Sequence, residues 1–201
     1  MIGIVDYGAG NLMSVKKAFD FLRVKNKILS KPDELDTINR LVLPGVGSFG
    51  HAVAIMRETN FYDPIKEWVT ANQPFLGICL GLQLLFESSQ EAECIAGFSF
   101  FKGKCRRFLE KKVPQIGWNN IQIERNNSLF DGMTSGEYFY FVHSYYVVPE
   151  EADVILAESN YGLNYTSVAG RGNVYGVQFH PEKSGPAGLK LLKNWVEQCW
   201  Q

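Results

Sequence analysis

The sequence predicts an α/β fold: a central parallel or mixed sheet with helices on both faces and extra antiparallel strands in the C-terminal half. In the first half, short apolar runs alternate with stretches of helical period. Such alternation is typical of a parallel sheet covered on both faces. From about Phe98 onward, short β-rich runs separated by turn signals dominate. The 201 residues, 46% of them hydrophobic, suit one domain spanning residues 1–201.

The first half is expected to alternate strand and helix from its first residues. The expected strands are the apolar runs Ile2–Asp6, Asn26–Leu29, Leu41–Leu43 and Phe75–Ile78. The expected helices are Met13–Leu22, a short helix in Pro32–Asp36, Phe49–Arg57, Phe61–Thr70 and Leu82–Ser88.

The second half is expected to add short strands and to close with a helix. Its β-rich runs are Lys104–Phe108, Asn120–Glu124, Tyr138–Val142, Tyr145–Val148, Val154–Ser159, Leu163–Val168 and Val174–Phe179. The final helix is expected at Pro186–Trp200, with one apolar side formed by Leu189, Leu192, Trp195, Val196 and Cys199.

Composition and charge exclude several classes of function. The net charge is −1 with both signs mixed along the chain, so neither a nucleic acid nor a membrane is an expected partner. No apolar stretch approaches the length of a membrane span, and the N-terminus has the pattern of a strand instead of a signal peptide.

The four cysteines stand at positions 79, 94, 105 and 199, with no C-x-x-C pair and no His/Cys cluster of metal-ligand spacing. We therefore expect no metal and no cofactor. Reduced thiols of this kind fit a cytoplasmic enzyme. Cys94, Cys105 and Cys199 are expected to be structural or incidental, because they lack the local context that surrounds Cys79.

Cys79 lies in Gly77-Ile78-Cys79-Leu80-Gly81, between an expected strand and an expected helix. Glycines two residues to each side leave room for a sharp strand-to-helix turn, where the two backbones pass closely. The Leu80 N–H and the positive end of the helix would favour a thiolate and hold a developing oxyanion. A lone cysteine is more often a buried core residue, but the paired glycines favour a nucleophile.

His180 and Glu182 follow the alternating run Gly172–Phe179, at a strand end where open α/β sheets place their sites. A cysteine nucleophile needs a base, and the base needs a third group that fixes its tautomer. The chain has only three histidines, at positions 51, 143 and 180. A single histidine is more often structural, but the order Cys, His, Glu favours His180 as base and Glu182 as its orienting group.

Two loops also follow expected strands. Pro44-Gly45-Val46-Gly47 shares the sheet edge with Cys79 and can supply a second backbone donor, although a plain tight turn is the alternative. Asp6–Asn11 contains a G-x-G, but the third glycine of a dinucleotide fingerprint would fall at Met13. A nucleotide site is therefore not expected there.

These motifs resemble those of the triad-type, class I glutamine amidotransferases, through GICLGLQLLF around Cys79 and GVQFHPEKS around His180. More narrowly, the chain is similar to the family of glutaminase subunits of imidazole glycerol phosphate synthase, from histidine biosynthesis. That likeness rests on DYGAGN at Asp6–Asn11, PGVGSFG at Pro44–Gly50, GWN at Gly117–Asn119 and HSYY at His143–Tyr146. The chain departs from the family at Gln115-Ile116, where a histidine is expected, so a paralogue that feeds another synthetase stays an alternative.

The resemblance implies a class I glutamine amidotransferase fold and a glutaminase that passes ammonia to a (β/α)₈ cyclase subunit in a heterodimer. It implies a Cys79, His180 and Glu182 triad with a thioester intermediate. The other positions that match family sites are Val46, Gly47 and Leu80 for the oxyanion hole, Gln83, Glu91, Ser144 and Tyr145 for glutamine, and Asn11, Trp118, Tyr140 and Lys183 for the partner.

Two other classes of function stay open at this point. One is a stand-alone Cys peptidase or deglycase-like hydrolase on a similar sheet, which Gln83 and the HSYY run disfavour. The other is a regulatory binding module that kept the fold without the activity, which the intact Cys-His-Glu set disfavours. Release of ammonia from glutamine separates all three.

Overall fold

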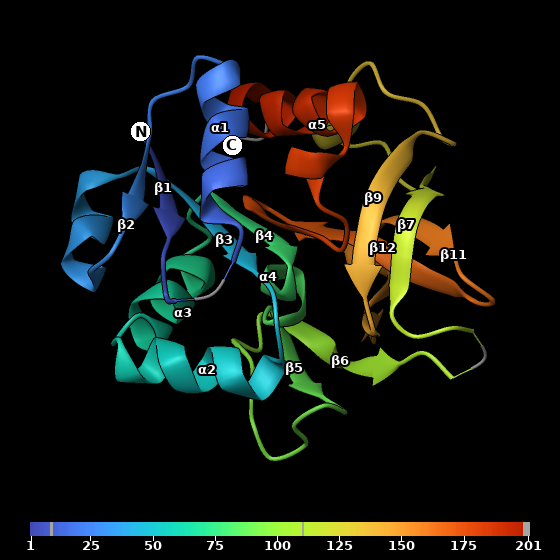
Figure 1. The fold of residues 1–201 in the computed structure, drawn as a ribbon, viewed down its shortest axis with the longest axis horizontal. Helices are drawn as coiled ribbons and strands as arrows, with labels where there is room; N and C mark the ends of the chain where they lie inside the picture. Colours follow the sequence, from blue (N-terminus) through green and yellow to red (C-terminus); the bar gives the residue numbers. More distant parts are fainter. Residues whose placement is uncertain (9, 110, 199–201) are drawn as a thin grey trace.

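The computed structural model describes residues 1–8, 10–109 and 111–198, and a mixed sheet forms its centre (Figure 1). Along the sheet the strand order is β2 (Asn26–Leu29), β1 (Ile2–Val5), β3 (Arg40–Gly45), β4 (Phe75–Cys79), β13 (Val174–Val177), β12 (Asn164–Arg171), β10 (Tyr145–Pro149), β6 (Phe101–Arg107) and β5 (Phe86–Ser89). The strands from β2 to β13 pair in parallel. The β13–β12, β12–β10 and β10–β6 pairs are antiparallel. The predicted α/β class and the added antiparallel strands are therefore confirmed.

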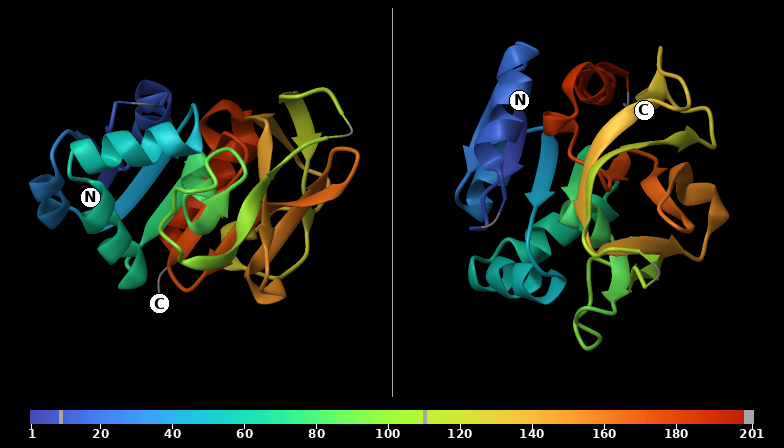
Figure 2. Two further views of the ribbon diagram at one scale, coloured as in Figure 1. Left: turned by 90° about the horizontal axis from the view of Figure 1, so that it is seen from below. Right: turned by 45° about the vertical axis from the view of Figure 1, so that its right-hand side comes forward.

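Helices cover both faces of the parallel part, as predicted (Figures 1 and 2). One face carries α1 (Leu12–Phe21) and α5 (Gly185–Gln198), and the other carries α2 (Phe49–Glu58) and α3 (Tyr62–Thr70). Each layer buries its own apolar cluster: Phe19 packs on Trp195 with ring centroids 6.1 Å apart, while Met56 and Ile65 lie in the second cluster. Because both faces are covered, the central strands are buried and their carboxyl ends form a rigid edge for a site.

Part of the second half stands beside the main sheet as an antiparallel ribbon of β7 (Gln115–Asn120) and β9 (Tyr138–His143) (Figure 2). The side chains of β9 alternate: Phe139 and Phe141 are buried, and Tyr138 is exposed. The short strands β8 (Gln122–Ile123) and β11 (Ile155–Asn160) extend the main sheet behind this ribbon.

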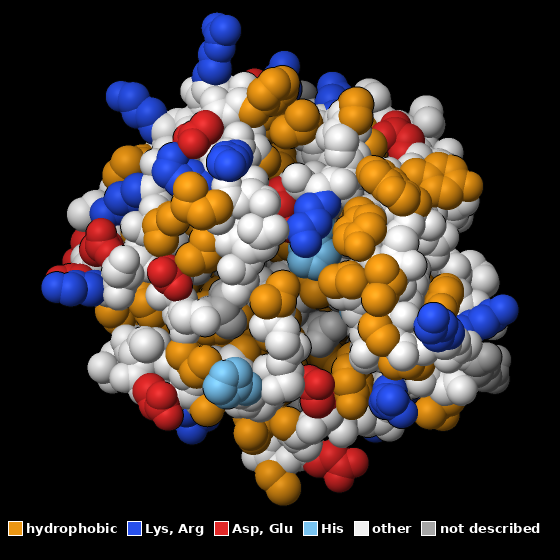
Figure 3. Space-filling model, in the orientation of Figure 1, with side chains coloured by type: hydrophobic (Ala, Val, Ile, Leu, Met, Phe, Trp, Pro, Cys, Tyr) orange, Lys and Arg blue, Asp and Glu red, His pale blue; other side chains and the backbone are white. Residues whose placement is uncertain are grey.

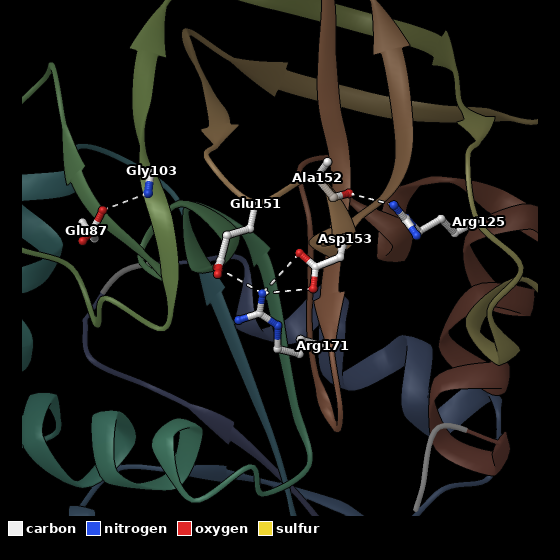
Figure 4. A network of polar contacts seen from close by, with 7 residues as sticks. All are labelled: Glu87, Gly103, Arg125, Glu151, Ala152, Asp153 and Arg171. Atoms are coloured by element: carbon white, nitrogen blue, oxygen red, sulfur yellow. Dashed lines mark hydrogen bonds and ion pairs between the residues drawn. The ribbon is translucent and has the colours of Figure 1, made fainter.

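Polar contacts between exposed side chains connect the turn before β11 to the end of β12 (Figure 4). The Arg171 guanidinium lies 3.0 Å from the Glu151 carboxylate and 3.3 Å from the Asp153 carboxylate. All three side chains are well exposed, so the contacts add about 0–1 kcal/mol to stability. Most of the stability therefore comes from the two buried clusters.

The predicted helix Leu82–Ser88 is wrong. The helix after Cys79, α4 (Leu80–Gln83), is one turn long, and the chain then enters strand β5. Leu84, Leu85 and Phe86 are all fully buried, so the run has no solvent face of the kind a surface helix presents. Pairing of β5 with β6 satisfies its backbone instead.

Other boundaries also differ from the sequence expectations. The expected strand Asn120–Glu124 is divided between the end of β7 and the two-residue β8, and the strand expected to reach Phe179 ends at Val177. The short helix at Pro32–Asp36 is a 3₁₀ helix, η1 (Pro32–Thr37). Three further 3₁₀ turns are η2 (Ser128–Phe130), η3 (Ala152–Val154) and η4 (Pro181–Lys183). Cys199 and the expected end of the last helix lie outside the described residues.

Acidic and basic side chains are interspersed on the face shown in Figure 3, in keeping with the mixed charge of the sequence. Within the described ranges, none of the helices has the length and apolar character required to cross a membrane. Those ranges also contain no group of three His, Cys, Asp or Glu side chains placed to hold a metal ion.

Candidate active site

Cys79 lies at a strained turn between β4 and α4. Its backbone has φ 56° and ψ −105°, a conformation that residues other than glycine rarely adopt. The two neighbouring glycines are required for close packing: a Cβ at Gly81 would lie 2.1 Å from the Leu43 carbonyl oxygen, and one at Gly77 would lie 2.4 Å from the Gly81 carbonyl oxygen. The steric reason expected for the glycine spacing is thus present in the structure.

His180 follows β13 and is held by a buried carboxylate. Its Nδ1 lies 2.9 Å from Glu182 Oε1, and both side chains are at most 3% exposed. The carboxylate oxygen accepts a hydrogen bond from the Nδ1–H group, so Nε2 is the ring nitrogen left for other partners. Backbone bonds fix the ring's position, because the His180 N–H donates to the Tyr140 carbonyl at 2.9 Å and Ser184 Oγ donates to the His180 carbonyl.

The protonation of His180 depends on Cys79 and Glu182. Burial alone lowers the pKa of the imidazole, but the adjacent Cys79 sulfur and the Glu182 carboxylate outweigh it and raise the pKa to about 10. Nε2 is buried and has no hydrogen bond of regular geometry among the described residues, yet the sulfur is near enough to shift this pKa. The imidazolium is therefore the stable form of His180 at neutral pH.

A cavity of about 210 Å³ opens beside the sulfur. Its walls bring together residues of β4, α4, β9 and β10 with the loops that follow β3 and β5 and precede β7. The lining residues are Val46, Gly47, Cys79, Leu80, Gln83, Glu91, Pro114, Val142, His143, Ser144 and Tyr145. All the residues expected at the oxyanion hole and at the glutamine site are among them. The volume is below the range usual for drug-sized ligands, which suits an amino acid.

Backbone geometry places the expected oxyanion loop beside Cys79. Gly45 is in register with Cys79 on the adjacent strand, so Val46 and Gly47 follow directly at the cavity. Gly47 has φ +95°, and a Cβ there would meet nothing within 4 Å. Glycine is therefore needed at this position for its backbone conformation and not for space.

The side chains expected to bind substrate have distinct partners. Gln83 Nε2 donates to the Tyr145 carbonyl at 3.0 Å. Glu91 is exposed, and its Oε2 accepts the Phe49 N–H at 2.6 Å, where α2 begins. Ser144 and Tyr145 follow directly after β9, as expected from the strand boundary. The cavity thus offers a carboxylate and a side-chain amide.

Three of the four expected interface residues form one surface cluster. Trp118 is 56% exposed and stacks edge-on against Tyr140, with centroids 6.1 Å apart, and Lys183 Nζ lies 5.9 Å from the Tyr140 ring. Trp118 lies on strand β7. Asn11 is exposed at the start of α1, where its side chain makes no capping hydrogen bond.

The sequence analysis missed two buried side chains at the site. Gln178 is fully buried, and its Nε2 lies 3.6 Å from the Cys79 sulfur. His143 lines the cavity, and its Nδ1 donates to the Tyr145 carbonyl at 2.8 Å. Burial lowers the pKa of His143 to about 4, so its ring is neutral. Each is a polar residue in an otherwise apolar β run, a signal that could have identified both.

Cys94, Cys105 and Gln115 do not line the cavity, and the burial and contacts of each are plain. Cys105 is buried and donates to the Gln83 carbonyl at 3.7 Å, whereas Cys94 is exposed. Gln115 is buried on β7 and accepts the Tyr165 hydroxyl at 3.1 Å. The residue that differs from the expected histidine is therefore a packed structural amide.

Comparisons with known proteins agree with this geometry. Residues 3–199 match the family model for glutamine amidotransferase class-I. The chain is 45% identical over 202 residues to the imidazole glycerol phosphate synthase subunit HisH of Desulfitobacterium hafniense, covering 98% of this chain and 96% of that one. It is 46% identical over 201 residues to the subunit of the same name from Methanocaldococcus jannaschii, covering 98% and 99%.

A solved structure extends the likeness to the fold. The structure of PurLQS from Thermotoga maritima superposes with a TM-score of 0.78 at 20% identity, over 97% of this chain and 96% of that one. The chain is therefore a member of the class I glutamine amidotransferase family, and within it of the family of HisH subunits of imidazole glycerol phosphate synthase.

Proposed function

We propose that the chain hydrolyses glutamine as the glutaminase subunit of an imidazole glycerol phosphate synthase, with Cys79 as nucleophile, His180 as acid and base, and Glu182 as the group that orients His180. The observation that carries this assignment is the buried His180–Glu182 pair, which acts on a sulfur held at a strained turn in the cavity wall. Such an arrangement is the one that cysteine nucleophiles require.

In the first half-reaction, the Cys79 thiolate attacks the side-chain carboxamide carbon of glutamine. The oxyanion that forms is held by the Leu80 N–H and by a peptide N–H of the Val46–Gly47 loop. The His180 imidazolium then gives its Nε2 proton to the departing nitrogen, which leaves as ammonia. The C–N bond breaks as the tetrahedral centre collapses to a γ-glutamyl thioester on Cys79.

In the second half-reaction, neutral His180 removes a proton from water and the resulting hydroxide attacks the thioester carbonyl. The C–S bond breaks, glutamate leaves, and the thiolate–imidazolium pair is restored. Glu182 stays ionised throughout and keeps Nδ1 protonated, so that Nε2 always faces the reacting atoms.

The cavity walls match the two ends of the amino acid. The Glu91 carboxylate can accept hydrogen bonds from the substrate ammonium group, while backbone N–H groups at Ser144 and Tyr145 can hold its carboxylate. Gln83 contributes a side-chain amide between them. A cavity of about 210 Å³ leaves little room for the main chain of a peptide substrate, which disfavours a peptidase.

A (β/α)₈ cyclase is the partner that we propose for the surface cluster of Trp118, Tyr140 and Lys183, in a cytoplasmic heterodimer. Trp118 is a large, exposed aromatic of the kind that anchors interfaces. Lys183 follows Glu182 directly, so docking on Lys183 can adjust the triad. Ammonia would pass to the cyclase, and rotation of a peptide in the Val46–Gly47 loop would couple partner binding to hydrolysis.

The nucleophile is tested by labelling the chain with a diazo-ketone analogue of glutamine. We expect the label on Cys79 alone, and we expect Cys79→Ser to remove glutamine hydrolysis while the protein stays folded. Exposed Cys94 and buried Cys105 are internal controls in the same digest. Labelling chiefly of Cys94 or Cys105 contradicts the assignment.

The partner is tested by steady-state hydrolysis of glutamine by the chain alone, then with the cyclase and its nucleotide ligand. We expect slow hydrolysis alone and clear stimulation in the complex, weakened by Trp118→Ala and by Lys183→Ala. The matched control is Lys193→Ala, a half-exposed lysine of α5 whose ammonium lies 3.9 Å from the Glu197 carboxylate. Full turnover without the cyclase, or unchanged stimulation in Lys183→Ala, contradicts this part of the proposal.

A further inference from the structure

We propose that Gln178 is a further catalytic residue, whose side-chain amide donates a hydrogen bond to the Cys79 sulfur and holds it as a thiolate. A chain of hydrogen bonds also joins this amide to Gln83 in the cavity wall, so that Gln178 links the substrate pocket to the nucleophile. The inference rests on the proposed role of Cys79 as nucleophile.

The orientation of the amide follows from its neighbours. The Tyr145 carbonyl can only accept a hydrogen bond, so the Gln83 atom 3.0 Å away must be its NH₂ group. The same NH₂ lies 3.2 Å from the Gln178 side chain, which must therefore present its oxygen there. The NH₂ group of Gln178 is left on the other side, where it lies 3.6 Å from the Cys79 sulfur.

Burial makes this contact chemically significant. Gln178 is fully buried, and its backbone N–H donates to the Ser167 carbonyl at 2.8 Å, which fixes the residue just beyond β13. A buried NH₂ group needs acceptors, and the acceptor that the structure gives this one is sulfur. Because an ionised acceptor binds an N–H more strongly than a neutral one, the contact favours the thiolate over the thiol.

The thiol form has its own weaker partner. The sulfur lies 3.8 Å from the Val142 carbonyl, which can accept from S–H but cannot stabilise a thiolate. The two contacts therefore favour opposite protonation states, with Gln178 and His180 on the side of the thiolate. Without Gln178, the Val142 carbonyl would shift the balance at the sulfur toward the neutral thiol.

The link to Gln83 adds dependence on the substrate. Both hydrogens of the Gln83 amide are used, by Tyr145 and by Gln178, so its oxygen is the atom left to accept an N–H from a ligand. An N–H donated to that oxygen polarises the chain of amides and strengthens each bond along it. Occupancy of the cavity therefore strengthens the hydrogen bond to the sulfur.

The experiment measures alkylation of Cys79 by iodoacetamide as a function of pH, with the modified peptides quantified by mass spectrometry. In Gln178→Met, which keeps the length of the side chain but removes the donor, we expect the midpoint of the Cys79 profile to rise by about one pH unit. That change corresponds to about tenfold slower alkylation at pH values below the midpoint. Exposed Cys94 reports reagent reactivity in the same sample and should not change.

Two further variants separate a local role from a structural one. Asn194→Leu removes another buried amide, which donates hydrogen bonds to the Leu129 and Asp131 carbonyls and makes no contact with Cys79 or Gln178 among those that the structure gives it. This variant should lower stability without moving the Cys79 profile. If Gln178→Met does not fold, Gln178→Asn withdraws the donor by one methylene and should move the profile in the same direction. Circular dichroism and thermal melting verify the fold of each protein.

A folded Gln178 variant whose Cys79 profile coincides with that of the original protein overturns the inference. This outcome differs from failure of the proposed function, which appears as labelling by the diazo-ketone analogue at a cysteine other than Cys79. Norvaline, an unreactive amino acid of similar length with no side-chain carboxylate, can occupy the cavity and tests the link: it should shift the profile downward in the original protein but not in Gln83→Met. An equal shift in both overturns the coupling through Gln83.

Discussion

The strained backbone of Cys79 predicts an inversion of the usual ranking of alanine and glycine. At an ordinary position, replacing alanine by glycine lowers the free energy of unfolding by about 0.5–1 kcal/mol, because glycine loses more backbone entropy on folding. Cys79 has φ 56° and ψ −105°, and a side chain held in such a conformation costs about 1–3 kcal/mol. Glycine avoids that cost.

We therefore expect Cys79→Gly to be more stable than Cys79→Ala. The difference between strain and entropy is about 1 kcal/mol in favour of glycine, which for a chain of 201 residues corresponds to a Tm higher by about 2–4 °C. Neither variant should hydrolyse glutamine. The comparison isolates the backbone, because both variants lack the sulfur and differ only in Cβ.

Thermal melting and urea unfolding of the two variants provide the measurement. Ala18→Gly is the matched control: Ala18 is a buried residue of α1, and its replacement should lower stability by about 1 kcal/mol. If Cys79→Gly is less stable than Cys79→Ala by the amount seen at Ala18, then the turn is relaxed and the reasoning about a strained backbone at Cys79 is refuted.

Four other predictions concern the site. Gly81→Ala should lower the stability by about 1–3 kcal/mol and slow hydrolysis on the order of 100-fold, since its Cβ would lie 2.1 Å from the Leu43 carbonyl oxygen and must displace the turn. Gly136→Ala is the control: its Cβ meets nothing within 4 Å but its φ of +96° strains the backbone, so it should lower the stability by about 1–3 kcal/mol and retain full activity. Glu182→Gln should slow hydrolysis by roughly 10³–10⁴-fold by changing the His180 tautomer, and unchanged kcat would remove Glu182 from the triad. Hydrolysis should persist in excess chelator, and restoration by a divalent ion after a loss would reveal a metal site. Stability should decline on both sides of neutral pH because of His143 and His180, as argued below.

The sharp turn at Cys79 and the pairing of His180 with Glu182 could be predicted from sequence because their signals are local. Gly77 and Gly81 lie two residues from Cys79, and the reason for that spacing is a contact of backbone with backbone within one turn. His180 and Glu182 are separated by one residue, so their pairing needs no knowledge of the fold. Short-range geometry of this kind is encoded in the residues that adopt it.

The helix expected at Leu82–Ser88 failed for a long-range reason. A short apolar run fits a buried strand as well as a helix, and here Phe86 pairs with Phe101 of β6 fifteen residues later. The same limit applies to Gln178 and His143. Both lie inside motifs that were recognised, but their partners come from distant strands, and a polar residue in a strand does not reveal what it contacts.

The two buried histidines are expected to change the stability with pH in opposite directions, because folding lowers the pKa of His143 and raises that of His180. The pKa of His143 is lowered from 6.5 to about 4, mainly by burial and to a smaller extent by repulsion from His180. Between these values the unfolded chain binds a proton that the folded chain does not, so stability is fully present above about pH 6.5. It falls toward pH 4 by up to about 1.4 kcal/mol per pH unit.

His180 has the opposite sign. Burial alone would lower its pKa, but Cys79 and Glu182 raise it from 6.5 to about 10, so its contribution to stability is fully present below pH 6.5 and is lost as the pH rises toward 10. In urea unfolding across this range, His143→Gln should flatten the acid side alone, because a glutamine cannot titrate. Cys79→Ala should reduce only the loss of stability at alkaline pH, because the sulfur is one of the groups that raise the pKa of His180. Equal slopes in all three proteins would mean that folding shifts the pKa of neither histidine, and that His180 is not held in the protonated state on which the proposed mechanism depends.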